Sequence, residues 1–289
     1  MAASLNPHIS QYSETFDAEK SSQYRMAIQF SLGGLSFALL DSTTNNLVGL
    51  EFHQSDHPTG SDDLFGTLER ALASKGMGNQ VFQSVSCLFD NRFCTLVPEP
   101  LFNEADKAKY LEFTFQIPEG YAVHSDKIEK AGCRNVYAYQ KTLKNKVLSK
   151  WENAQFMHTS TLFINKMMES QTTTGVYVNV RNHDFDMAAI KEGKLHFFNN
   201  FRFNTKEDFA YFLLFAMEQN GISGQDTPVC FSGLIRPDSE TIDLCEHYIK
   251  DLHFVEAPET LAHSQTFKEV PFQYYCIHYQ TLRHGTRAK

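Results

Sequence analysis

Hydrophobic and polar residues alternate in two stretches of the chain, and the two stretches resemble each other. Every second residue from Met26 to Leu32 is apolar, and the same two-residue period returns from Val176 to Val180. This period is typical of β-strands, whose successive side chains point to opposite faces of a sheet. After a short step, at 33–34 or 182–184, each stretch continues into a second alternating run and then a third apolar run. The pattern therefore predicts a three-stranded unit that occurs twice.

The first copy predicts three strands and then a helix, with the strands at 24–32, 35–41 and 46–53. Apolar residues between Leu64 and Leu72 fall on one helical face, as expected of a helix that packs on a core. Ser61 is the expected N-cap of this helix, and Lys75-Gly76 its expected end. A further strand is predicted through Val85.

The second copy repeats this order of elements. Thr205 followed by Asp208 resembles a capping box and predicts a helix start, and a strand is predicted at 229–231. Asp238 with Ser239 then opens another helix. The sequence separation between the helices of the two copies is about the same as that between their strands. This agreement favours duplication over chance.

The predicted organisation has a flexible tail and two lobes. We expect residues 1–23 to form the tail, 24–170 the first lobe, and 171–289 the second lobe with a C-terminal helix. The Pro-bounded, more polar segment at about 99–135 is interpreted as a small subdomain inserted in the first lobe. The chain is long enough for both lobes to bury a core.

Composition limits the classes of partner. The chain has 289 residues with 26 basic and 34 acidic side chains, a net charge of −8, whereas a nucleic-acid surface needs clustered cations. No apolar run approaches the roughly 20 residues that a membrane helix needs, so we expect a cytoplasmic protein. The six cysteines are scattered without a Cys-x-x-Cys pair. This predicts buried thiols, and neither a disulfide framework nor a zinc site.

The element order resembles the actin-like ATPase superfamily over residues 24–285, most closely its pilus-assembly and cell-division branch. It also resembles an uncharacterised bacterial family in which the nucleotide motifs are degenerate. The resemblance implies an α/β fold of two duplicated ribonuclease-H-like lobes that face one cleft. In active members, a strand in each lobe ends in Asp-x-Gly. The aspartate holds magnesium, and the glycine lets backbone N–H groups approach phosphate.

This chain departs from that motif in both lobes. Ser31 stands where the first aspartate is expected, and Arg181 and His183 replace the second aspartate and its glycine. A cation at a magnesium position repels the ion, so we expect no catalytic residues and no metal site. The resemblance still implies vestigial candidates for nucleotide binding at Gly33, Gly34, Ser36, Ser232 and Gly233.

We therefore expect a pseudo-ATPase that acts as a protein-binding or scaffold module without a cofactor. Losing one preorganised stabilising group costs about 10²–10³ in rate, and both turns are changed here. The partner would be a protein, and the candidate surfaces are the inserted subdomain and the aromatic runs at 197–198 and 201–203. The alternative is a nucleotide-binding ATPase or switch that holds ATP and magnesium through relocated ligands such as Asp41, Asp184 or Asp186.

Overall fold

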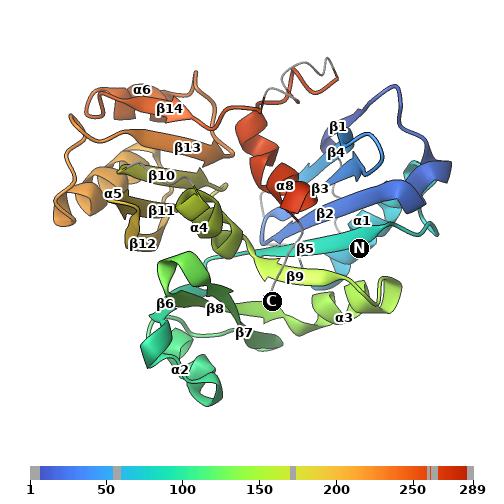
Figure 1. Cartoon of the computed structure of the whole chain (residues 1–289), viewed down its shortest axis with the longest axis horizontal. Coiled ribbons are helices and arrows are strands. Elements are labelled where there is room, and N and C mark those ends of the chain that lie inside the picture. The colour runs from blue at the N-terminus through green and yellow to red at the C-terminus, as the bar shows by residue number, and fades with distance from the viewer. Residues whose placement is uncertain (1–6, 55–59, 170–173, 259–260, 262–265, 285–289) are drawn as a thin grey trace.

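The computed structural model describes residues 7–54, 60–169, 174–258, 261 and 266–284. Strands of these residues form a six-stranded sheet, a five-stranded sheet and a smaller three-stranded sheet. Figure 1 shows the two large sheets on either side of a central pair of helices, with the small sheet below them.

The six-stranded sheet has the order β1-β4-β3-β2-β5-β9. Strands β2, β3 and β4 are antiparallel neighbours, and β5 and β9 continue the sheet in parallel with β2. Helix α1 (Ser61–Ser74) buries Leu64, Leu68 and Leu72 in the core of this sheet. The strands are β1 (Pro7–Tyr12), β2 (Tyr24–Ser31), β3 (Gly34–Asp41), β4 (Asn46–Gln54), β5 (Ser84–Asp90) and β9 (Gln155–His158).

The five-stranded sheet has the order β12-β11-β10-β13-β14. Its pairings repeat those of β4-β3-β2-β5-β9 strand by strand, antiparallel on one side of β10 and parallel on the other. The duplicated unit predicted from the alternating pattern is therefore present in the fold. The strands are β10 (Gly175–Val180), β11 (Asp184–Lys191), β12 (Lys194–Arg202), β13 (Val229–Gly233) and β14 (Leu252–Phe254).

Two helices cover the second sheet, and both begin at predicted caps. In α5 (Lys206–Gln219) the Thr205 hydroxyl accepts from the Asp208 N–H, and the Asp208 carboxylate accepts from the Thr205 N–H, which completes the capping box. In α6 (Glu240–Glu246) the Ser239 hydroxyl accepts from the Ile242 N–H. These bonds satisfy N–H groups that the first helical turn leaves free.

The N-terminal segment differs from its prediction. The prediction of a flexible tail over residues 1–23 is wrong from residue 7 onward, because β1 pairs with β4 and a 3₁₀ turn (Ala18–Gln23) follows; residues 1–6 lie outside the described part. The Tyr12 and Ser10 hydroxyls donate to the buried Glu51 carboxylate at 2.7 and 3.2 Å. Their hydrogen bonds, with that of His53, give this buried polar group partners and tie β1 to β4, because burial without partners is costly.

A second correction concerns the start of α1. Gly60, in extended conformation, occupies the N-cap position, and no side chain caps this helix. Ser61, the expected N-cap, is its first helical residue.

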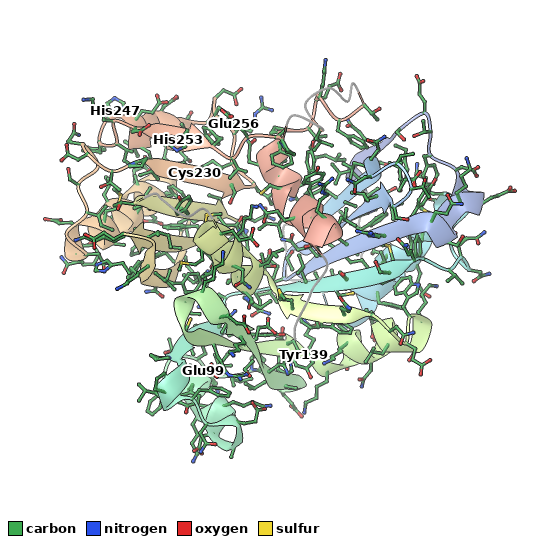
Figure 2. The ribbon with its side chains drawn as sticks, in the orientation of Figure 1. Glu99, Tyr139, Cys230, His247, His253 and Glu256 are labelled. Carbon is green, nitrogen blue, oxygen red and sulfur yellow. The ribbon has the colours of Figure 1, made fainter. Side chains whose placement is uncertain are left out.

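The small sheet is inserted in the chain between β5 and β9. Its strands run from residue 94 to residue 140, beyond the predicted subdomain bounds of about 99–135. It has the order β6-β8-β7 and carries the short helix α2 (Lys107–Glu112). Glu99, labelled in Figure 2, lies on this subdomain and pairs with Arg134 at 3.2 Å. The strands are β6 (Cys94–Pro98), β7 (Tyr121–Ile128) and β8 (Cys133–Gln140).

Helix α3 (Lys141–Lys150) leads from the small sheet back to β9. Helices α4 (Thr159–Glu169) and α8 (Phe272–His284) then lie between the two large sheets (Figure 1). One face of α8 packs Tyr275 and Tyr279 on the first sheet, and the other packs Ile277 in a cluster shared with α4 and β11. The C-terminal helix that was expected in the second lobe thus packs against both lobes. No helix in the described part of the chain is long and apolar enough to cross a membrane.

Candidate functional site between the two large sheets

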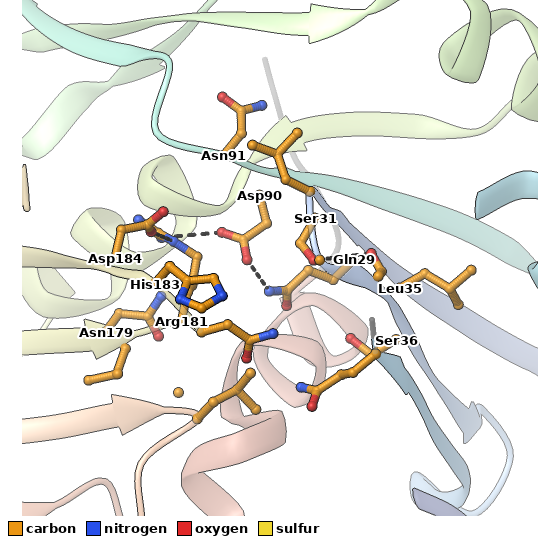
Figure 3. Close-up of a pocket in the computed structure, with 18 of the residues that line it drawn as sticks. Gln29, Ser31, Leu35, Ser36, Asp90, Asn91, Asn179, Arg181, His183 and Asp184 are labelled. Atoms are coloured by element: carbon orange, nitrogen blue, oxygen red, sulfur yellow. Dashed lines mark hydrogen bonds and ion pairs between the residues drawn. The ribbon is translucent and has the colours of Figure 1, made fainter. Parts of the chain in front are cut away.

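A cavity of about 280 Å³ lies where corresponding ends of the two large sheets face each other (Figure 3). The β2–β3 turn contributes Ser31 and Gly34, the β10–β11 turn contributes Arg181 and Asp184, and β13 contributes Gly233. Ligands of open α/β sheets bind outside the carboxyl ends of the parallel strands. This cavity occupies that position in both sheets at once.

Arg181, directly after β10, dominates the electrostatics of the cavity. Its side chain is buried, and its guanidinium contacts three carboxylates. Nη2 and Nη1 donate to the two oxygens of Asp186 at 2.8 and 3.0 Å, Nη1 also donates to Asp90 at 3.2 Å, and Nε donates to Asp184. Figure 3 shows this residue between Asp184 and Asp90. One guanidinium therefore neutralises acidic groups from both sheets.

The two fully buried carboxylates respond differently to this shared cation. Burial opposes the ionised form of Asp186, but the Arg181 charge and hydrogen bonds from Arg181, Ser160 and Asn200 outweigh burial and lower the pKa of Asp186. Burial raises the pKa of Asp90 to about 6, against the opposing effect of Arg181. Asp90 has only one contact to Arg181 and one hydrogen bond from Gln29, at 2.7 Å. Asp90 therefore has fewer donors than Asp186, and the negative charges of Asp186 and Asp184 raise its pKa further.

The hydroxyl groups near the cavity are already engaged within the protein. Ser36 forms a hydrogen bond of 2.9 Å with His278 of α8, and burial lowers the pKa of His278 to about 4, so this histidine is neutral at pH 7. Ser31 donates to the Gly34 carbonyl at 3.1 Å. Ser232 donates to the Val178 carbonyl and to Asn179 Oδ1, at 3.3 and 3.1 Å. These bonds would have to break or be shared before a phosphate could use the hydroxyls.

The glycines of the turns are explained by the close approach of neighbouring backbone. A Cβ on Gly34 would lie 2.0 Å from the His53 carbonyl oxygen, and one on Gly233 would lie 2.1 Å from the Val180 carbonyl oxygen. Both residues also have φ values, +143° and +83°, that L-residues rarely adopt. Strand packing alone therefore requires glycine at these two positions.

The structure brings most of the predicted nucleotide-site residues together. Gly33, Gly34, Ser36 and Gly233 line the cavity, whereas Ser232 is buried and is not part of its lining. Among the relocated ligands, Asp184 lines the cavity and Asp186 is fully buried. Asp41 is paired with Asn46 and Tyr24 at the opposite end of β3 from Gly34, so it cannot contribute.

The sequence-based interpretation missed Asp90 and Gln29. Asp90 ends β5, the parallel neighbour of β2, and Gln29 lies near the end of β2 itself. A polar residue at the carboxyl end of a buried parallel strand is a signal that could have found Asp90.

A magnesium ion does not fit the acidic residues as they are arranged. Asp90, Asp184 and Asp186 all direct oxygens at the Arg181 guanidinium, which repels a second cation at the same place. Within the described residues, no group of three or more histidine, cysteine, aspartate or glutamate side chains is placed to hold a metal.

A family model described as "Protein of unknown function (DUF3822)" matches residues 13–252. The chain belongs to this family. No curated protein matches it in sequence.

Comparison with solved structures identifies the fold of this DUF3822 protein. A Bacteroides thetaiotaomicron protein, described as having an actin-like ATPase fold and unknown function, superposes with a TM-score of 0.73 at 20% identity, covering 83% of this chain and 94% of that one. A chain of a PilM–PilN type IV pilus biogenesis complex gives a TM-score of 0.58 at 9% identity, covering 89% and 97%. The DUF3822 chain thus has the actin-like ATPase fold, as its element order implied.

Proposed function

We propose that this DUF3822 protein does not hydrolyse ATP and acts in the cytoplasm as a protein-binding or scaffold module. The observation that carries the proposal is the Arg181 guanidinium, which lies among Asp90, Asp184 and Asp186. In the actin-like superfamily this turn is expected to hold magnesium. Here a buried side-chain cation lies at this turn and contacts carboxylates of both sheets.

The energetic argument is that magnesium would have to displace Arg181. Removing one partner from a buried ion pair costs about 3–5 kcal/mol, so a metal must first compensate that loss. Phosphoryl transfer depends mainly on positioning and electrostatic stabilisation by metal ions and donors. A cleft that disfavours the ion lacks the main source of catalysis.

Two further observations support a binding role. The PilM-type neighbour is named as one component of a complex with PilN, which associates this fold with protein partners in that system. All six cysteines of the present chain are unpaired thiols, which supports a reducing compartment.

The proposal is tested by phosphate release and by thermal unfolding with millimolar ATP and Mg²⁺. We expect no phosphate above the level of a blank and no rise in melting temperature, since a ligand that binds only the folded state would raise it. A turnover that Asp184→Ala abolishes would overturn the proposal.

A second candidate, a nucleotide-dependent switch, is favoured by one observation. Asp184 lines the cavity beside the retained glycines, and it is less buried than Asp90 and Asp186. Nucleotide that raises the melting temperature without being hydrolysed would support this candidate.

A further inference from the structure

We propose that the outer edge of β12 accepts an extended acidic segment of a partner protein as an additional strand. This inference rests on the proposed protein-binding function and names the chemistry of the partner. Strand β12 is an edge strand of the second sheet, and within the described residues nothing pairs with its outer side.

The twin sheet shows how such an edge is covered. Strand β4 occupies in the first sheet the position that β12 occupies in the second, and β1 pairs with its outer side in antiparallel direction. β12 and β4 have the same length of nine residues. One of two equivalent edges is thus completed by the chain itself, and the other is left open.

The backbone of β12 directs hydrogen-bonding groups outward. The Phe203 N–H donates to His183 O, toward β11, and successive residues of a strand alternate in direction. Phe198, Asn200 and Arg202 therefore present their N–H and C=O groups to the outer side. The Asn199 side chain accepts from the Asn200 N–H at 2.9 Å. The outward backbone groups of Phe198 and Arg202 bond no described residue, so they can pair with an added strand.

The charges along this edge select the partner. Lys194 and Arg202, at the two ends of β12, are exposed and form no ion pair with a described residue, although the whole chain has a net charge of −8. One extra residue in β12 between Leu195 and Phe197 shifts its register with β11, so these two side chains lie on opposite faces of the sheet, and Arg202 also lines the central cavity. Because both ends of β12 are cationic, pairing with β12 of a second copy would bring like charges close together at its ends, which is destabilising. An acidic segment of another protein gains attraction at both positions.

Aromatic side chains continue from β12 onto helix α5. The Phe201 and Phe212 rings stack with centroids 6.0 Å apart, and Tyr211 contacts both Phe212 and Phe215. Tyr211 and Phe215 are 60% and 44% exposed. Apolar side chains on the α5 face of the added strand would extend this aromatic row, which predicts a partner segment with an acidic residue near each end and alternating apolar residues between them.

The test uses a fluorescein-labelled nine-residue peptide with glutamate at both ends, and with threonine alternating with valine or phenylalanine between them. Two control peptides replace glutamate by lysine, or carry N-methyl groups on alternate residues so that one edge cannot donate. We expect the glutamate peptide to bind about tenfold more tightly than the lysine peptide, because two opposed charge pairs are involved. The N-methylated form should not bind, and hydrogen exchange should slow at 198 and 202.

Matched variants identify the site on the protein. Lys194→Glu with Arg202→Glu should reverse the preference toward the lysine peptide, whereas Lys250→Glu, an exposed lysine of the same lobe, should leave it unchanged. Equal binding of the N-methylated peptide, protection outside 194–202, or no binding of any peptide would overturn the inference. Failure here leaves the nucleotide and phosphate-release results untouched, so the two proposals are judged separately.

Discussion

Arg181 Nη1 lies 3.2 Å from Asp90 Oδ1, and the two residues belong to different sheets. Arg181 follows β10 of the second sheet, and Asp90 ends β5 of the first. This contact, with the paired Asp186 beside it, joins the lobes across the bottom of the cavity. A buried ion pair therefore bridges the two large sheets beside the cavity of this actin-like fold.

Replacing Arg181 should destabilise the protein strongly. Arg181→Ala leaves three buried or half-buried carboxylates facing one another, and the expected loss in the free energy of unfolding is about 3–5 kcal/mol at pH 7. Urea unfolding of both proteins measures it. The deficit should shrink as the pH falls toward 5, because protonation then removes the repulsion. Arg181→Lys keeps the positive charge without the forked contact, so its free energy of unfolding should fall less than that of Arg181→Ala. Equal losses in the two variants would contradict the electrostatic explanation.

A divalent cation should partly restore the Arg181→Ala variant. Without the guanidinium, the charges of Asp90, Asp184 and Asp186 are no longer compensated, and these side chains must rearrange before their oxygens can bind a hard cation. Millimolar Mg²⁺ or Mn²⁺ should raise the melting temperature of the variant and leave that of the wild type unchanged. A similar rise in both proteins would show that the ions bind elsewhere.

The turn glycines should be intolerant of alanine whether or not nucleotide binds. Gly233→Ala places a Cβ within 2.1 Å of a backbone oxygen, and strain together with overpacking should cost about 3 kcal/mol or more. Gly66→Ala is the matched control, because Gly66 lies inside α1 and a Cβ there meets only the end of the Arg70 side chain, at 3.3 Å. Chemical unfolding should show the control to be neutral or slightly stabilised; equal effects would refute the packing explanation.

The buried His278 should make stability depend on pH. Its pKa is lowered from 6.5 to about 4 in the folded state, so the unfolded state binds more protons between these values. Stability is then lost as the pH falls through this window, at up to roughly 1.4 kcal/mol per pH unit. His278→Asn removes this contribution. The difference in unfolding free energy between wild type and variant should therefore shrink on acidification, and a constant difference would contradict the assignment.

The regular elements were predictable because their signals are local. The strand predicted at 35–41 is found at Gly34–Asp41, and the helix opened by Thr205 has the predicted capping box. Alternation of apolar residues and cap residues depends only on neighbours in sequence. The short strand β9 (Gln155–His158) was missed, since four residues carry too little pattern and its pairing with β5 is non-local.

The site was predictable only in part. The motif positions led to Arg181 and to the retained glycines, but the partners of Arg181 depend on how the sheets are placed relative to each other. Asp90 lies 91 positions before Arg181 in sequence, and no local pattern joins them. The pairing of β1 was missed for the same reason, because it depends on the contact of Tyr12 with the distant Glu51.

The central claim is that the Arg181 guanidinium excludes the magnesium ion that nucleotide chemistry needs. Isothermal titration of the wild-type protein with ATP, with and without Mg²⁺, tests it most directly. We predict no saturable, magnesium-dependent heat at millimolar ATP. Saturable binding that requires Mg²⁺ and is lost in Asp184→Ala would show that the cleft still holds a metal–nucleotide complex, and would contradict the account.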